Sequence, residues 1–124
     1  MLGRVAPYLY ALLRIVAGLA WAEHGAQKLF GVLGAKQAVE ITSQLGLAGI
    51  LEFVGGILIA LGLFTTPVAF VASGEMAWAY FQQHFPRGPW PIQNGGELAV
   101  LYCFIFLYLS AVGSGKLSID SIRK

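Results

Sequence analysis

The stretch LGLAGILEFVGGILIALGLF, residues 45–64, decides the fold class because it is long and almost entirely apolar. A helix needs about 20 such residues to cross the roughly 30 Å hydrocarbon core of a bilayer. Its only charged residue is Glu52, and its five glycines allow helices to approach closely in lipid. The stretch therefore predicts a transmembrane helix that packs tightly against its neighbours.

Three further apolar stretches have a similar length, at residues 5–30, 67–85 and 95–112. Segments rich in glycine or proline separate the four stretches, and such segments interrupt helices. The joint between the second and third stretches is so short that these two helices must be antiparallel neighbours. The chain is thus predicted to be all-α, a single domain over residues 1–124 that forms an integral membrane four-helix up-down bundle.

Local signals set the expected helix ends. Gly31 is expected to end the first helix, and Thr66 to cap the third, with Pro67 at its first position. Before the fourth helix, Asn94 is expected to be the N-cap, with Glu97 at the third helical position as in a capping box. These expectations can be compared directly with the structure.

Composition excludes several classes of protein. Of the 124 residues, 57% are hydrophobic and only 11% are charged, against about 25% charged in soluble domains. No run of basic residues predicts nucleic-acid binding. A single cysteine, Cys103, cannot form an intrachain disulfide, so a redox role would need a bound cofactor or a partner. No metal site is predicted, because neither histidine has a glutamate three residues before it.

Lysine and arginine in the loops predict the orientation, because positive residues concentrate on the cytoplasmic side. Four crossings place both termini on one side of the membrane. That side holds Arg4, Lys116, Arg123 and Lys124, and the other side holds Lys28, Lys36 and Arg87. Both termini are therefore predicted to be cytoplasmic, with residues 116–124 as a polar tail.

Two charged residues lie deep in helices that run in the same direction. A charge at the centre of a membrane helix costs about 2.5–3.5 kcal/mol on insertion scales, so such residues usually find partners. One hypothesis is a buried ion pair between Arg14 and Glu75. The alternative is that Arg14 extends to the cytoplasmic interface and Glu75 is protonated.

Polar residues gather at the helix ends that an up-down bundle places on the outer side. They form a candidate polar pocket of Glu23, His24, Gln27, Glu52, His84, Asn94 and Glu97. Two histidines and several carboxylates in a partly desolvated pocket could carry protons. The alternative is ordinary contact with water and headgroups, which is favoured for Lys28, Gln82, Gln83 and Trp90.

Several motifs, in this order and spacing, resemble those of DoxX family membrane proteins. They are RIVAG at 14–18, HGAQKLFG at 24–31, EFVGG at 52–56, LGLFT at 61–65, HFPR at 84–87, NGGE at 94–97 and LY at 101–102. The resemblance implies a four-helix protein of the bacterial inner membrane. Some members of the family are similar to the small subunit of thiosulfate:quinone oxidoreductase, and others act beside redox enzymes or in their maturation.

Three functions compete at this point. The first is a membrane subunit of a quinone-linked oxidoreductase, with quinone in the outer polar pocket and a protein partner. The second is a non-catalytic assembly, chaperone or scaffold subunit whose glycine-rich helix 45–64 docks a partner helix or another copy of the chain. The third is a small transporter of protons or solutes that uses Arg14 and Glu75.

Overall fold

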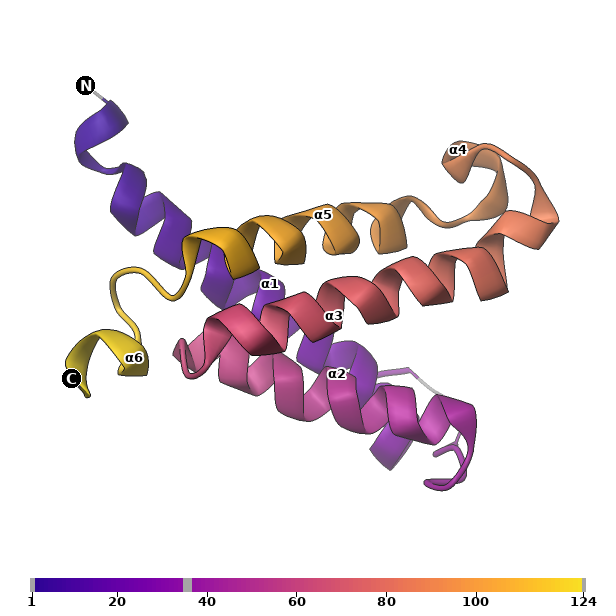
Figure 1. The fold of residues 1–124 in the computed structure, drawn as a ribbon. Helices are drawn as coiled ribbons and strands as arrows, with labels where there is room; N and C mark the ends of the chain where they lie inside the picture. Colours follow the sequence, from indigo (N-terminus) through magenta and orange to yellow (C-terminus); the bar gives the residue numbers. More distant parts are fainter. Residues whose placement is uncertain (1, 35–36, 124) are drawn as a thin grey trace.

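The computed structural model describes residues 2–34 and 37–123, and every regular element in them is helical (Figure 1). The elements are η1 (Leu2–Arg4), α1 (Ala6–Phe30), α2 (Gln44–Leu61), α3 (Thr65–Ala79), η2 (Tyr80–His84), η3 (Phe85–Arg87), α4 (Pro91–Asn94), α5 (Glu97–Val112) and α6 (Ile119–Ile122). The all-helical prediction is confirmed for these residues. Segment η2 is π-helical and continues α3 without a break, so this rod extends over residues 65–84.

Successive long helices run in opposite directions, so the molecule has two distinct ends. Figure 1 shows both chain ends, the joint between α2 and α3 and the end of α5 on the left. The short helix α4 and the start of α2 lie on the right. We call the first the terminal end and the second the opposite end.

Glycines bring α1 and α2 into backbone contact. A Cβ atom added at Gly18 would lie 2.6 Å from both the backbone nitrogen of Ala60 and the backbone oxygen of Gly56. Gly25 meets the backbone of Phe53 in the same way, about two helical turns further along α1. The glycines of α2 therefore serve a close contact within the chain, as the small residues of membrane helices commonly do.

The core is small and lies between α1, α3 and α5. Aromatic rings fill its middle, with Trp21 4.9 Å from Phe106 and Tyr102 stacked on Phe106 at 5.4 Å between centroids. Between α3 and α5, the Ser73 hydroxyl donates a hydrogen bond of 2.7 Å to the carbonyl of Cys103. These contacts hold α3 and α5 side by side, as Figure 1 shows.

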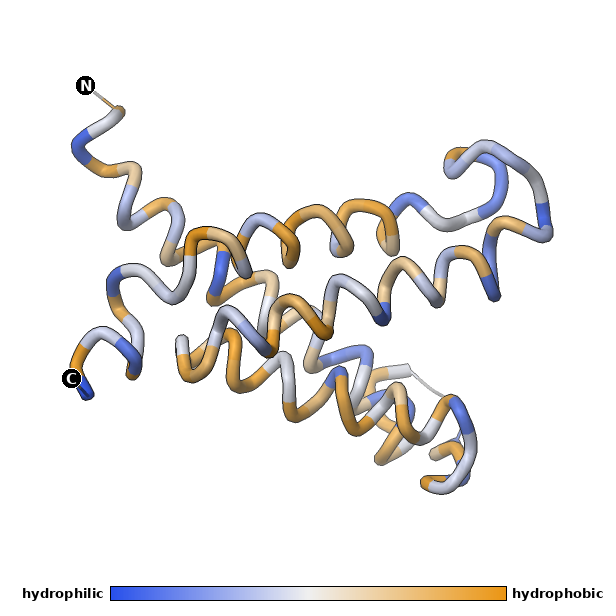
Figure 2. The backbone as a smooth tube through the Cα atoms, in the orientation of Figure 1, coloured by the Kyte–Doolittle hydropathy of each residue, from blue (hydrophilic) through white to orange (hydrophobic). Residues whose placement is uncertain are grey.

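The distribution of polarity is the reverse of that in a soluble protein. Large apolar side chains such as Phe70, which is 64% exposed, Leu19 and Phe104 point outward, while Arg14 and Glu52 are buried. In Figure 2 the hydrophobic colour covers most of the four long helices. A surface of this kind suits a hydrocarbon medium, whereas a water-soluble monomer rarely exposes large contiguous apolar patches.

One helix among residues 2–34 and 37–123, α2, is both long and apolar enough to cross a bilayer by the combined test of length and hydropathy. Helix α5 is equally apolar in character but has 16 residues. Helix α3 has 15 residues before the backbone changes to the π-helical form of η2.

Two predicted helix starts are wrong, and one predicted end is confirmed. Gly31 ends α1 in the left-handed conformation, with φ of 64°. Helix α3 begins at Thr65, not after Thr66, because the backbone of Phe64 turns into the left-handed region with φ of 55°. Asn94 ends α4 and is not the N-cap of α5, because Gly95 and Gly96 lie between Asn94 and the start of α5. Glu97 is therefore the first residue of α5 rather than the third.

Candidate functional site

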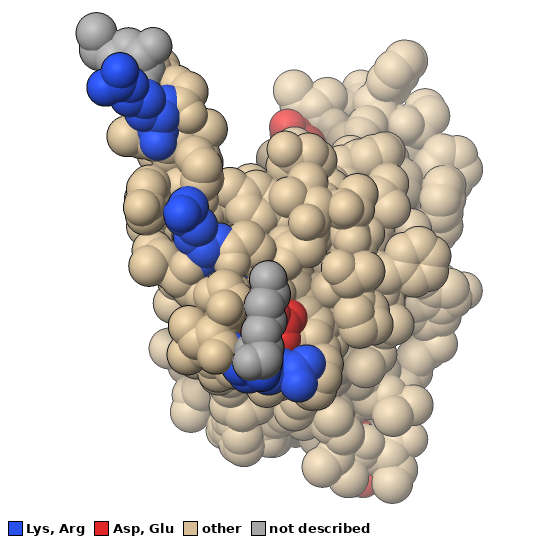
Figure 3. Space-filling model, turned by 60° about the vertical axis from the view of Figure 1, so that its left-hand side comes forward, with Lys and Arg blue, Asp and Glu red and all other residues tan. Residues whose placement is uncertain are grey.

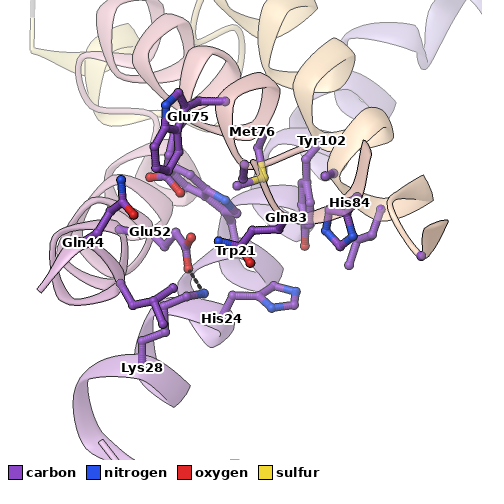
Figure 4. A pocket seen from close by; sticks show the side chains of 17 residues that line it. Trp21, His24, Lys28, Gln44, Glu52, Glu75, Met76, Gln83, His84 and Tyr102 are labelled. Atoms are coloured by element: carbon purple, nitrogen blue, oxygen red, sulfur yellow. Dashed lines mark hydrogen bonds and ion pairs between the residues drawn. The ribbon is translucent and has the colours of Figure 1, made fainter. Parts of the chain in front are cut away.

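A cavity of about 300 Å³ lies between α1, α2, α3 and α5 at the opposite end of the molecule. We call it the polar cavity; Figure 4 shows its side chains. Its walls combine aromatic and polar groups that come from all four long helices and η2. They include Trp21, His24, Lys28, Gln44, Glu52, Glu75, Met76, Trp78, Gln83, His84 and Tyr102.

Three charged groups meet in the cavity wall. Lys28 Nζ lies 2.7 Å from Glu52 Oε1, and the Glu52 residue is only 3% exposed. Glu75 lines the same cavity from α3. Its Oε1 atom is buried and has no hydrogen-bond partner among the described residues. One ammonium cannot neutralise two carboxylates in a low-dielectric site, so the cluster favours binding of a proton or of a hydrogen-bond donor.

Aromatic side chains form the inner wall of the cavity. The Trp21 residue is 2% exposed, and its indole Nε1 is buried with no hydrogen-bond partner within residues 2–34 and 37–123. A buried indole N–H usually finds an acceptor. The His24 ring stands edge-on to Tyr102, with 6.0 Å between centroids. The cavity wall thus combines flat apolar surface with two residues, Trp21 and Glu75, that each carry a buried polar atom without a partner among the described residues.

The π-helical segment η2 brings His84 to the cavity rim. π-helical turns are rare and often mark functional sites. His84 Nδ1 lies 3.2 Å from the carbonyl oxygen of Asn94. The Asn94 side chain is buried and holds the loop: its amide donates 2.9 Å bonds to the Tyr80 hydroxyl and the Gly88 carbonyl. Asn94 therefore positions the loop around His84 rather than lining the cavity.

Three of the seven predicted pocket residues line the polar cavity: His24, Glu52 and His84. Glu23 and Gln27 instead lie with His24 around a separate, shallower hollow. Helical geometry explains the separation, because neighbouring positions on α1 face different sides. Glu97 is exposed at the start of α5 and does not line the cavity.

Four residues that were not predicted to belong to the pocket line the polar cavity. Lys28 and Gln83 were expected at the membrane interface because they lie at helix ends. Glu75 was expected to pair with an arginine, and Trp21 had no predicted role in the site. The i,i+4 spacing of His24 and Lys28 was the available signal for Lys28, since both positions share one helix face.

The Arg14 guanidinium is fully buried near the terminal end and is bound by backbone carbonyls. Its Nε donates to Ile59 at 3.0 Å, and its Nη2 donates to Leu117 at 2.7 Å. The acceptors, which we call the Arg14 carbonyl cluster, are the carbonyls of Ile59, Ala60, Ser114, Lys116 and Leu117.

The predicted Arg14–Glu75 ion pair is therefore corrected. The ion pairs in the described residues are Lys28–Glu52 and Arg123–Asp120. Glu75 lies in the polar cavity, while the guanidinium of Arg14 meets carbonyls at the end of α2 and after α5. Carbonyls at a helix C-terminus lack intrahelical donors, so they are natural acceptors for a buried cation.

Comparison with known proteins agrees with this architecture. The sequence model of the DoxX family matches residues 9–85, which include the Lys28–Glu52–Glu75 cluster. The chain belongs to the DoxX family. This DoxX protein is 43% identical over 122 residues to an uncharacterized protein of Haemophilus influenzae, covering 93% of this chain and 90% of that protein. No solved structure matches the chain. Membership of DoxX identifies it as a membrane protein.

The C-terminal segment of this DoxX protein folds back onto the terminal end instead of forming a free polar tail. The backbone N–H of Asp120 donates a 3.0 Å bond to the Gly62 carbonyl. The Ser114 hydroxyl lies 2.6 Å from Asp120 Oδ2 and 2.8 Å from the Thr65 hydroxyl. The Ser114 hydroxyl, followed by the Phe64 backbone amide, the Arg123 side chain and the Thr65 backbone amide, lowers the pKa of the Asp120 carboxyl to about 2.

This pKa predicts acid release of the C-terminal segment of the DoxX protein. The folded pKa of Asp120 lies below the ordinary value of 3.8, so the carboxylate stabilises docking above pH 4. That stabilisation is lost as pH falls from about 4 through about 2. We expect hydrogen exchange of the Asp120 amide, corrected for intrinsic rate, to accelerate over this window. Asp120→Asn should show no such step, and wild-type protection that is constant down to pH 2 would contradict the expectation.

Proposed function

We propose that this DoxX protein is a multi-pass protein of the bacterial inner membrane, with α1, α2, the α3–η2 rod and α5 as its four spans. The outward apolar side chains and buried charges support this assignment. At 1.5 Å per residue, the rod over residues 65–84 is long enough to cross roughly 30 Å of hydrocarbon. A similar protein in the bacterium Haemophilus influenzae supports the bacterial setting.

The distribution of positive charge supports cytoplasmic termini. Arg4, Lys116 and Arg123 belong to the terminal end, and Figure 3 shows blue surface along the projecting N-terminal segment and beside the C-terminus. Lys28 pairs with Glu52 at the opposite end and Arg123 pairs with Asp120 at the terminal end, which leaves Arg4 and Lys116 at the terminal end against Arg87 at the opposite end. Lys36 and Lys124 lie outside the described residues. The excess of unpaired positive residues favours the terminal end as the cytoplasmic side.

The proposed activity is binding of a quinone headgroup in the polar cavity, as the membrane subunit of an oxidoreductase system. The observation that carries it is a cavity with aromatic walls and two unused polar atoms, Trp21 Nε1 and Glu75 Oε1. A quinone carbonyl accepts a hydrogen bond, and the hydroxyl of the reduced form donates one. The Trp21 indole and the Glu75 carboxyl are therefore the wall groups whose chemistry suits the two redox forms.

The residues of the cavity would handle protons and not electrons. Reduction of a quinone to a quinol consumes two electrons and two protons. The described residues hold no disulfide, and the one cysteine, Cys103, lies outside the cavity lining. The electrons therefore come from a partner protein in this proposal. His24 and the Glu52–Glu75 pair are the groups placed to give protons to the two ring oxygens or to take them.

Quinone binding by the purified protein tests this function. Titration of a short-chain benzoquinone should quench tryptophan fluorescence, because Trp21 and Trp78 line the cavity. His24→Ala and Glu52→Gln should each weaken binding about tenfold, the loss expected for one hydrogen bond of about 1.4 kcal/mol. Glu97→Gln is the matched control, since Glu97 is exposed and lies outside the cavity lining.

Circular dichroism must show that each variant remains folded, because Glu52→Gln leaves Lys28 without its carboxylate. Equal affinity in all variants, or no saturable quenching of the wild-type protein, contradicts the proposal.

An assembly subunit was one alternative, on the ground that the glycine-rich face of α2 could dock a partner helix. In the structure α1 already packs on that face. Gly56 contacts the backbone of Gly18 and Ala22 in α1, and Gly55 adjoins the Trp21 ring. The small-residue face of α2 is therefore occupied within the chain. A docking partner for the redox proposal has to use another surface.

A further inference from the structure

An apolar groove continues the polar cavity along the crevice between α2 and α3. It has a volume of about 330 Å³, and its lining is almost free of polar surface. Its walls include Val54, Gly55 and Leu58 of α2 and Val68, Val71 and Ala72 of α3. Figure 1 shows α2 and α3 diverging from their joint.

The groove and the polar cavity are consecutive parts of one path. Trp21 lines both hollows. Glu52 and Glu75 of the cavity lie three residues from Gly55 and Ala72 of the groove, about one helical turn away. The glycine at position 55 leaves room for the Trp21 ring, which would be 3.0 Å from an added Cβ. The lining therefore changes from polar, in the cavity, to apolar, in the groove, at the Trp21 ring.

This shape fits a ligand with a small polar ring and a long apolar chain. We propose that the apolar groove binds the isoprenoid tail of a membrane quinone whose headgroup occupies the polar cavity. The inference rests on the proposed function and names the substrate class as tailed quinone rather than a free, water-soluble ring. A groove of about 330 Å³ accommodates a single chain but is too narrow for a helix of about 10–12 Å diameter.

The tail gains affinity through packing rather than through removal from water. Lipid is as apolar as the groove, so transfer of the tail between them releases little hydrophobic free energy. What the groove adds is close van der Waals contact along Val54, Val71 and the Trp21 ring, together with a fixed entry angle for the headgroup. A side chain that fills the groove should therefore act on tailed ligands alone.

The test uses two benzoquinones that differ only in a decyl tail or a methyl group at the same ring position. Affinities are measured by quenching in identical detergent micelles, with corrections for micelle partitioning. We expect wild type to bind the decyl form about tenfold more tightly. Val54→Phe and Val71→Phe should remove that advantage and leave the methyl form within about twofold of wild type. Leu19→Phe is the control, because Leu19 is exposed on α1 outside both hollows.

The outcomes separate the inference from the proposed function. Binding of the methyl form as tight as that of the decyl form overturns the groove and leaves the quinone site standing. Equal losses in Leu19→Phe and Val71→Phe also overturn the groove. Displacement of the decyl quinone by decanoate at equal concentration assigns the groove to acyl chains and overturns the inference. Absence of binding by either quinone removes the proposed function itself.

Discussion

Gly25→Leu is expected to destabilise this DoxX protein by about 3 kcal/mol or more, near the upper end for overpacking. A side chain at this position would collide with the backbone of Phe53 and Gly49 in α2. Backbone cannot rotate away as a side chain can, so α1 and α2 would have to separate. Their separation would also break the wall that carries Trp21 and Lys28.

Gly74→Leu is the matched control for this prediction. Gly74 also lies inside a long helix, α3, but nothing stands within 4 Å of an added Cβ atom. Leucine favours a helix over glycine by roughly 0.5–1 kcal/mol, so the control should be neutral or slightly stabilising. The measurement is the midpoint of unfolding by sodium dodecyl sulfate in mixed micelles, followed by circular dichroism. Equal midpoints for the two variants would falsify the tight α1–α2 contact.

Arg14→Met is expected to destabilise the protein by about 3 kcal/mol or more, because several carbonyls lose a charged donor and each unsatisfied buried group costs about 1–3 kcal/mol. The change removes the guanidinium from five buried or partly buried carbonyls, of which that of Ile59 keeps a bond from the Gly62 N–H. The segment after α5 should then detach, so protease cleavage near Leu117 should accelerate with the loss of stability. Unfolding midpoints and cleavage rates in the same micelles measure both effects.

Three variants test the assignment of Arg14. Arg4→Met removes an exposed arginine from the same end and should leave the midpoint unchanged. Arg14→Lys keeps the charge but cannot reach five acceptors with three donors, so it should recover only part of the stability. Glu75→Gln should stay near wild type in unfolding. If Glu75→Gln lowered the unfolding midpoint as much as Arg14→Met, the result would support the Arg14–Glu75 ion pair and contradict the assignment of Arg14 to the carbonyl cluster.

The positions of the long helices could be predicted from the sequence because one physical rule determines them. A span needs a fixed length of apolar residues, and glycine or proline must interrupt the backbone between spans. Glu52 lies in the cavity lining, and its position inside an apolar run was the signal, since a carboxylate there usually faces the bundle interior. Because Glu52 lies in the first half of α2, the cavity was expected near the end of the bundle where α2 begins.

The hydrogen-bond and ion-pair partners of the charged residues could not be predicted from the sequence. Glu75 and Arg14 lie on helices of the same direction, but pairing depends on depth and on helix rotation, which vary with packing. The carbonyls that hold Arg14 carry no sequence signal, because every residue has one. The docked segment over residues 113–123 has no apolar periodicity, and its place against the bundle depends on contacts with residues distant in the sequence.

The start of α3 shows a smaller error of the same kind. Thr66 and Pro67 match the preferred residues for a helix start. The left-handed backbone of Phe64 begins the helix earlier, and this places the Thr65 hydroxyl beside Ser114. A tertiary contact thus outweighed the local capping preference.

The carbonyl cluster has a consequence for how the chain is made. Three of the five acceptors of Arg14 follow it by 100 to 103 residues. At about 5–20 residues per second, the ribosome needs roughly 5–20 s to deliver them. During that interval α1 holds a cation that lacks these three acceptors, although those of Ile59 and Ala60 follow Arg14 by only 45 and 46 residues. The terminal end of the bundle can therefore close around the guanidinium only after the segment beyond α5 has been synthesised.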